Sequence, residues 1–313
     1  MAYLVTGGAG FIGSHIVEEL VRRGEKVRVL DNFLTGKREN IAPFQDLIEL
    51  VEGDIRDFKT CRQALEGIEY VLHQAALPSV PRSIEDPLLA HEINVRGTLN
   101  LLMASLEAKI RKFVFASSSS VYGDHPRLPQ KEGNEGMPLS PYAASKSAAE
   151  KFCQAFSAVY GLETVSLRYF NIFGPRQDPF SQYAAAIPIF IRKILAEENP
   201  EIFGDGEQSR DFTYVSNAVE ANLRAIEAPP EAAGGVFNIA CGERTTVNIL
   251  VNEISKLIGT SCEPIYVDTR PGDIKHSFAD ISAAKTVLGF EPAVNFKQGL
   301  KRTVAWYKKK EIG

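Results

Sequence analysis

The chain has 313 residues, of which 44% are hydrophobic and 24% charged, as is typical of a globular protein with a large core. Its net charge of −4 gives no reason to expect nucleic-acid binding, and no apolar run is long enough to span a membrane. Cys61, Cys153, Cys241 and Cys262 are scattered without metal-ligand spacing. We therefore expect reduced thiols, no metal site and a cytoplasmic protein.

The N-terminal segment contains a strand, a glycine turn, a helix and a second strand. An apolar strand at Ala2–Thr6 leaves no room for a signal peptide, and Gly7, Gly10 and Gly13 follow it. In this context, glycines let backbone amides approach a pyrophosphate at the positive end of a helix dipole. Asp31 ends the second strand, where a carboxylate hydrogen-bonds a ribose 2′-hydroxyl and repels the 2′-phosphate of NADP. The segment therefore predicts an NAD site.

Further strands alternate with helices. Strands are expected at Ile48–Val51, Tyr70–His73 and Lys112–Ala116, and a long helix from about Pro87 to Ala108. This alternation predicts an α/β fold with a Rossmann-type, doubly wound parallel sheet, whose ligands bind beyond the carboxyl ends of the strands. We expect residues 1–170 to form the NAD-binding domain, with 212–240 returning to it. Residues 171–211 and 241–313 then form a smaller mixed α/β cap that binds the substrate.

The segment SPYAASKSAAE, residues 140–150, predicts a helix with a reactive tyrosine. Ser140 can cap the helix and Pro141 suits its first position. Tyr142 and Lys146 are then i and i+4 neighbours, roughly 5–6 Å apart between Cβ atoms. A cation about 5 Å away, at an effective dielectric of ~20, favours a phenolate by about 3 kcal/mol, or roughly two pKa units. Taken alone, the same pair is equally compatible with a solvated helix surface.

These features together resemble the extended short-chain dehydrogenase/reductase family. Within it, the chain is most similar to UDP-sugar 4-epimerases, and the runs ASSSSVYGDHPRLP and RYFNIFGPRQDP are similar to those of UDP-N-acetylglucosamine 4-epimerases. The resemblance implies that a tightly bound NAD takes hydride from C4 of the sugar and returns it to the other face. It implies catalytic roles for Tyr142 as base, Lys146 as the group that lowers its pKa, and Ser118 as hydrogen-bond donor. Ser119 and Ser120 rank second to Ser118.

The resemblance also assigns the binding residues. For the cofactor these are Gly7, Gly10, Phe11, Ile12, Gly13, Asp31, Asn32, Asp54, Ile55, Ala75, Ala76, Asn94, Tyr142, Lys146 and Tyr169. For the UDP-sugar they are Ser79, Ser118, Ser119, Ser120, Tyr142, Asn171, Arg210, Arg270 and Ser277. The two arginines are expected at the diphosphate, and Ser277, where hexose-restricted relatives carry tyrosine, leaves space for an N-acetyl group. Arg168 and Arg176 are expected to be structural.

Other functions remain open at this point. Ser119 and Ser120 stand where related dehydratases and decarboxylases carry acids, which disfavours those reactions. Asn171 weakens the case for a UDP-glucuronate 4-epimerase without removing it, and an NAD-dependent sugar-nucleotide reductase or a non-enzymatic dinucleotide-binding protein are further alternatives. A homodimer formed through residues 87–108 and 140–160 is expected from relatives, although Leu88, Leu99 and Leu102 are equally compatible with packing on the sheet.

Overall fold

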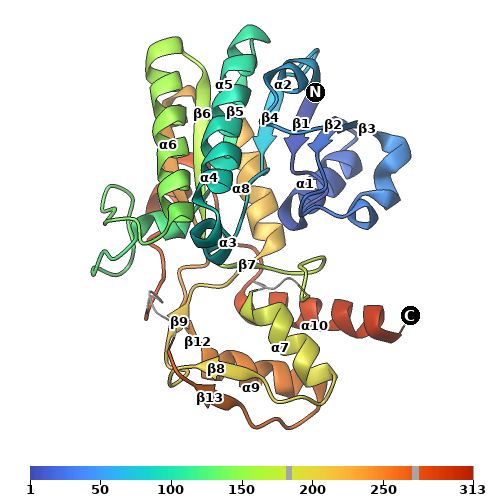
Figure 1. The fold of residues 1–313 in the computed structure, drawn as a ribbon, viewed down its shortest axis with the longest axis vertical. Helices are drawn as coiled ribbons and strands as arrows, with labels where there is room; N and C mark the ends of the chain where they lie inside the picture. Colours follow the sequence, from blue (N-terminus) through green and yellow to red (C-terminus); the bar gives the residue numbers. More distant parts are fainter. Residues whose placement is uncertain (181–184, 270–274, 313) are drawn as a thin grey trace.

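The structure is a computed structural model that describes residues 1–180, 185–269 and 275–312 (Figure 1). Its centre is a seven-stranded sheet with the order β11-β6-β5-β4-β1-β2-β3, in which all neighbours run parallel. The strands are β1 (Ala2–Thr6), β2 (Lys26–Asp31), β3 (Ile48–Glu52), β4 (Tyr70–His73), β5 (Lys112–Ser118), β6 (Glu163–Tyr169) and β11 (Gly235–Ile239). The predicted fold class is therefore confirmed.

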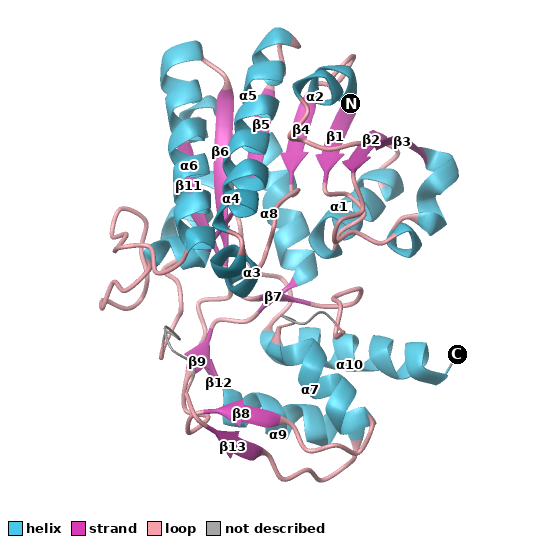
Figure 2. Ribbon diagram, in the orientation of Figure 1, coloured by secondary structure: helices cyan, strands magenta, loops and turns pink. Residues whose placement is uncertain are grey.

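Helices cover both faces of this sheet, as the ribbon in Figure 2 shows. On one face α1 (Phe11–Arg22) and α8 (Val215–Glu227) bury apolar side chains; on the other, α2 (Phe58–Ala64), α5 (Gly97–Glu107) and α6 (Pro141–Tyr160) do so. Because both faces are buried, the central strands are almost continuously apolar. The strand order reverses between β1 and β4, which is where ligands bind in sheets of this kind.

The helix expected from Pro87 to Ala108 is interrupted. It consists of α4 (Pro87–His91), a π-helical turn at Glu92–Arg96 and then α5. The Thr98 hydroxyl donates to the Asn94 carbonyl at 2.7 Å, while the Asn94 side chain accepts from the Leu77 amide at 2.7 Å. One of these contacts is local and the other comes from outside the helix, and neither is revealed by the local apolar pattern.

The cap has its own core, built on α7 (Ala186–Leu195), α9 (Val247–Ile258) and α10 (Phe296–Ile312). Three short strand pairs complete it: β7 (Ile172–Phe173) with β10 (Thr213–Tyr214), β8 (Glu201–Phe203) with β13 (Ile265–Val267), and β9 (Ser209–Arg210) with β12 (Thr245–Thr246). The helical turn η6 (Ala284–Leu288) instead packs against α8 and β11. The C-terminal third is therefore shared between the two cores.

The remaining elements are short. They are α3 (Val80–Glu85), η1 (Arg38–Asn40), η2 (Ala42–Leu47), η4 (Ser119–Tyr122) and η5 (Pro230–Ala232). Within the described ranges, no helix is both long and apolar enough to cross a lipid bilayer.

Candidate active site

A cavity of about 710 Å³ opens at the carboxyl edge of the sheet. The structure brings these predicted residues to its wall: Gly7, Gly10, Phe11, Ile12, Gly13, Asp31, Asn32, Asp54, Ile55, Ala75, Ala76, Ser79, Tyr142, Lys146 and Tyr169. They come from loops after β1, β2, β3 and β4 and from α6 and β6. The cavity thus joins the predicted cofactor residues to the predicted base.

The glycine turn has the shape that a dinucleotide pyrophosphate needs. Gly7 has a φ of +67°, and a Cβ there would lie 2.7 Å from the Ala75 nitrogen. A Cβ on Gly13 would lie 2.1 Å from the Gly7 carbonyl oxygen. A side chain at Gly7 would therefore collide with the backbone that follows β4, and one at Gly13 would push the first turn of α1 away from the glycine turn. Their absence leaves a backbone cradle at the helix N-terminus, which fits a phosphate ligand.

Asp31 is held rigidly at the rim of this cradle. Its carboxylate accepts hydrogen bonds from the Ala9 amide at 2.9 Å and the Phe33 amide at 2.8 Å. Burial raises the pKa of Asp31, while these two amides act in the opposite direction. An acceptor fixed in this way fits a ribose hydroxyl and disfavours an additional phosphate, as NAD binding requires.

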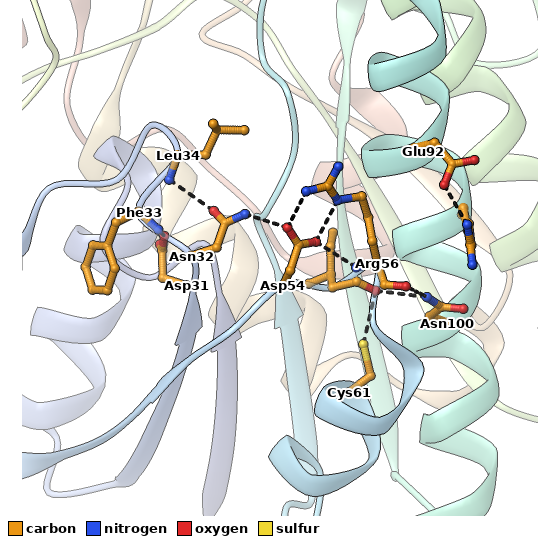
Figure 3. Close-up of polar contacts among 11 residues, drawn as sticks. Asp31, Asn32, Phe33, Leu34, Asp54, Arg56, Cys61, Glu92 and Asn100 are labelled. Carbon is orange, nitrogen blue, oxygen red and sulfur yellow. Dashed lines mark hydrogen bonds and ion pairs between the residues drawn. The ribbon is translucent and has the colours of Figure 1, made fainter.

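Asp54 connects the loops that follow β2 and β3 (Figure 3). Its carboxylate accepts from the Asn32 amide at 2.8 Å and from the Arg56 guanidinium at 2.7 Å. The hydrogen bond from Arg56 is the main reason that the pKa of Asp54 falls to about 2. The Ile55 carbonyl accepts from Asn100 at 3.0 Å. The Asp54 side chain therefore stabilises this part of the cavity wall, which was expected to bind the cofactor.

Ser118 ends β5 and is not among the residues that line the cavity. Its Oγ accepts from the Ser120 amide at 3.2 Å and from the Ser120 hydroxyl at 3.0 Å, so its own hydrogen remains available for another acceptor. Burial raises the pKa of Tyr142, and the hydrogen bond with Ser118 partly offsets this effect. Ser118 is therefore placed to stabilise an anionic oxygen at this point.

Lys146 is buried one helical turn after Tyr142. Its Nζ donates to the Ala116 carbonyl at 2.7 Å and lies 4.8 Å from the centre of the Phe115 ring. Burial lowers the pKa of Lys146 to about 8, against the opposing effect of Glu150. The structure thus differs from the expectation of a Tyr142 pKa lowered by this lysine: in the chain alone, burial dominates at both groups.

A buried ion pair supports the strand that carries these serines. Arg168, on β6, donates to the Glu150 carboxylate at 2.9 Å and 2.7 Å, and their side chains are only 2% and 1% exposed. The Ser117 hydroxyl donates to the same carboxylate. The Arg168 guanidinium also lies over the Tyr122 ring. Arg168 is therefore structural, as expected.

Several predicted residues lie outside the cavity wall. Asn94 is buried behind it and donates to Ser145 Oγ at 2.9 Å. Asn171 donates to the Asp211 carbonyl at 3.1 Å, and Arg210 donates to the Ser209 carbonyl at 3.0 Å. Ser277 is buried and donates to Gln130 Oε1 at 3.1 Å. Ser119 and Ser120 form η4 beyond β5, and Arg270 lies outside the described residues.

Further wall residues were not predicted from the sequence, among them the polar side chains of Lys37, Gln177 and Asp178. Gln177 Oε1 is buried and accepts no hydrogen bond from the described part of the chain, so it offers an acceptor that a ligand can satisfy. Both Gln177 and Asp178 belong to the RYFNIFGPRQDP run, whose similarity to known epimerases was the available signal.

The comparison with known families decides the identity of this site. A model of the NAD dependent epimerase/dehydratase family matches residues 3–240. The chain belongs to this family. A putative UDP-glucose 4-epimerase of Methanocaldococcus jannaschii is 43% identical over 307 residues, which cover 97% of this chain and 98% of that protein.

Two solved epimerase structures are similar over nearly the whole length. The Thermotoga maritima UDP-glucose 4-epimerase with UDP-glucose has a TM-score of 0.95 at 40% identity, covering 99% of this chain and 100% of its own. The Methanobrevibacter ruminantium UDP-N-acetylglucosamine 4-epimerase, in complex with UDP-N-acetylmuramic acid, has a TM-score of 0.94 at 44% identity, covering 99% and 98%. The chain is thus an NAD-dependent, UDP-sugar 4-epimerase-like enzyme of the extended short-chain dehydrogenase/reductase family, as its sequence predicted.

Proposed function

We propose that this epimerase interconverts UDP-GlcNAc with UDP-GalNAc, and UDP-glucose with UDP-galactose. The observation that carries the proposal is the position of Tyr142 and Lys146 in the wall of the same cavity that contains the glycine turn and Asp31. A tyrosine at this point suits the removal and return of one proton at a sugar oxygen. No external oxidant is required, because the reaction is an isomerisation.

The chain's own residues supply the proton chemistry. Bound NAD+ supplies a hydride acceptor, then a hydride donor, together with a positive charge. The Tyr142 oxygen takes the proton of the sugar 4-hydroxyl as C4 is oxidised, and returns it after the 4-keto sugar has turned over. The Ser118 hydroxyl hydrogen-bonds the same sugar oxygen, and Lys146 uses one donor on Ala116 and has two left for the ribose.

The size of the sugar pocket is proposed to depend on Ser277. A serine leaves room that a tyrosine would fill, and its buried position beside Gln130 gives it a fixed orientation. Ser277→Tyr is expected to remove activity on the N-acetylated sugars and to spare the plain hexoses. Ser277→Ala, which keeps the pocket open, should retain both. An equal loss of both activities in a folded Ser277→Tyr protein would refute this role.

Exposed apolar side chains on one helical layer support a homodimer. Leu88 on α4 is 76% exposed, Met103 on α5 44% and Val159 on α6 71%, whereas Leu102 is fully buried against the sheet. Helix α6 packs against both α4 and α5, so this layer can bury the three exposed side chains against a second copy of the chain.

All four cysteines are free thiols, which supports a reducing compartment such as the cytoplasm.

The test is an assay of all four UDP-hexoses without added cofactor. The purified chain is incubated with each sugar, and the anomeric NMR signals of substrate and 4-epimer are followed. Tyr142→Phe should lower the rate by about 10²–10⁴-fold while retaining NAD, because it removes the acid–base group alone. If NAD-loaded protein interconverts none of the four sugars, the proposal fails. Turnover that consumes stoichiometric NAD(H) would indicate a reductase instead.

A further inference from the structure

Residues Arg176–Asp178, here called the strap, border the cofactor cavity from the cap side. They follow β7, the short strand that is labelled below the central sheet in Figure 1. Gln177 and Asp178 line the cavity together with the glycine turn. Arg176 has a φ of +67°, a left-handed conformation that is uncommon for a residue with a side chain. Such backbone persists only where neighbouring contacts hold it.

The first end of the strap is bound to α1, the helix that begins at the glycine turn. Arg176 donates to His15 Nδ1 at 2.5 Å and to the Glu18 carboxylate. The other nitrogen of His15, Nε2, donates to the Pro175 carbonyl at 2.9 Å. Burial and the neighbouring guanidinium lower the pKa of His15 to about 3, so its Nδ1 remains an acceptor at neutral pH. The side chains of Arg176 and His15 are only 13% and 15% exposed, so the bond between them is largely shielded from water, whereas Glu18 is 49% exposed.

The second end of the strap is bound to the loop after β2. Asp178 pairs with Lys37 at 3.1 Å, and its other oxygen accepts from the Phe180 amide at 3.0 Å. The Lys37 amide in turn donates to the Ala9 carbonyl, inside the glycine turn, at 2.9 Å. The strap is therefore attached on both sides of the segment that cradles the pyrophosphate. From the cap, the Tyr307 hydroxyl donates to the Gln177 carbonyl.

We propose that the strap closes the cofactor cavity and sets how slowly NAD dissociates, with Arg176 and Asp178 as positioning residues. The proposal rests on the function above, because an epimerase must return hydride from the cofactor molecule that received it. Cofactor can leave over this edge only when the cap side separates from α1 and from the Lys37 loop. Breaking either attachment makes that separation easier and therefore accelerates release.

The experiment measures NAD dissociation from the full-length protein purified with its cofactor. The protein is diluted into an excess of an NAD-consuming dehydrogenase with its substrate, and NADH formation at 340 nm reports each NAD molecule released. The variants are Arg176→Leu and Asp178→Asn. The matched control is Arg22→Leu, which removes an arginine that is 70% exposed on the same helix and that, among the described residues, pairs with Glu19 of that helix. NAD bound per chain is determined in parallel after acid release.

Arg176→Leu is expected to accelerate NAD release about 10- to 100-fold, because it removes two charge-assisted hydrogen bonds, of which the one to His15 is shielded from water. Asp178→Asn should accelerate it about 2- to 5-fold, since its ion pair is exposed. Arg22→Leu should match the parent. A purely structural role for Arg176 predicts a lower melting temperature of the NAD-free protein with unchanged NAD release, and that result overturns the proposal.

If Arg176→Leu does not fold, Asp178→Asn still decides the test, because it changes only an exposed ion pair. Release of NAD from Asp178→Asn at the rate of the parent protein also overturns the proposal for the strap. A parent protein that is purified without NAD would overturn both the proposed role of the strap and the proposal that the enzyme works with a tightly bound cofactor. A parent that epimerises UDP-sugars with bound NAD, while both variants release NAD as slowly as it does, would overturn the strap alone.

Discussion

Replacing Arg168 by methionine should destabilise this enzyme far more than replacing a surface arginine. The substitution keeps an apolar stem of similar length but leaves the Glu150 carboxylate, 1% exposed, without its guanidinium partner. Removing one partner of a buried ion pair costs about 3–5 kcal/mol, because the remaining charge stays desolvated. With an unfolding entropy of about 2.1 cal/mol/K per residue, 313 residues give roughly 0.7 kcal/mol/K. The melting temperature should therefore fall by roughly 4–7 °C.

The second change that tests this reasoning is Glu150→Gln in the Arg168→Met background. A neutral amide still accepts from Ser117 but removes the unpaired charge, so the double variant should recover at least half of the lost stability. Arg224→Met serves as the matched control, because Arg224 pairs with Glu220 at 2.7 Å on an exposed helix face. Exposed i,i+4 pairs contribute only about 0.3–0.5 kcal/mol.

The assay is urea unfolding of the NAD-saturated proteins, followed by far-UV circular dichroism and by the fluorescence of the single tryptophan, Trp306. Circular dichroism reports both cores, and Trp306 reports the cap. If Arg168→Met costs no more than Arg224→Met, or if the double variant is as unstable as the single one, then the buried charge is not what destabilises the protein.

Two further predictions follow from the pKa shifts. Ser118→Ala removes the hydrogen bond that opposes the burial effect on Tyr142, so the Tyr142 pKa should rise and the acidic limb of the kcat profile should move to higher pH; steady-state rates across pH 6–10 with and without the substitution check this. Burial lowers the pKa of His73 to about 3 in the folded chain, against about 6.5 in the unfolded chain. The contribution of neutral His73 to the free energy of unfolding is therefore fully present above pH 6.5 and is lost as the pH falls toward 3. In His73→Gln, urea unfolding between pH 6.5 and 4 should show a slope that is shallower by about 1.4 kcal/mol per pH unit, and an unchanged slope would refute a neutral buried imidazole.

Local signals were sufficient to predict the fold and one side of the site. The strand that ends in the glycine turn and the strand that ends in Asp31 each predict a dinucleotide site from only a few neighbouring residues. The structure places the glycine turn and Asp31 together in the cavity wall, as expected. The helix that carries Tyr142 was equally readable, because Ser140 Oγ accepts from the Ala143 amide at 3.1 Å and Gly161 ends the helix with a φ of +71°. In each case a short-range rule and the tertiary fold agree.

Contacts between distant residues could not be read in the same way. Arg168 was expected to be structural, but nothing in either local pattern shows that its partner is Glu150 or that the pair is buried. The partner of Ser277 is Gln130, 147 positions away, and the partner of Asp178 is Lys37. The apolar pattern of residues 87–108 likewise does not show that Asn94 accepts from the Leu77 amide, 17 positions away.

The pKa shifts connect the strap to the chemistry. In the chain alone, burial lowers the pKa of Lys146 to about 8 and raises that of Tyr142, so on raising the pH the lysine loses its charge before the phenol becomes an anion. A lysine that titrates first cannot by itself keep the phenolate stable, and an additional positive charge is needed near the Tyr142 oxygen. NAD+ brings such a charge into the cavity whose wall contains both side chains. An attachment that prevents the cofactor from leaving therefore also preserves the base, which gives the contacts of Arg176 and Asp178 a chemical consequence at Tyr142.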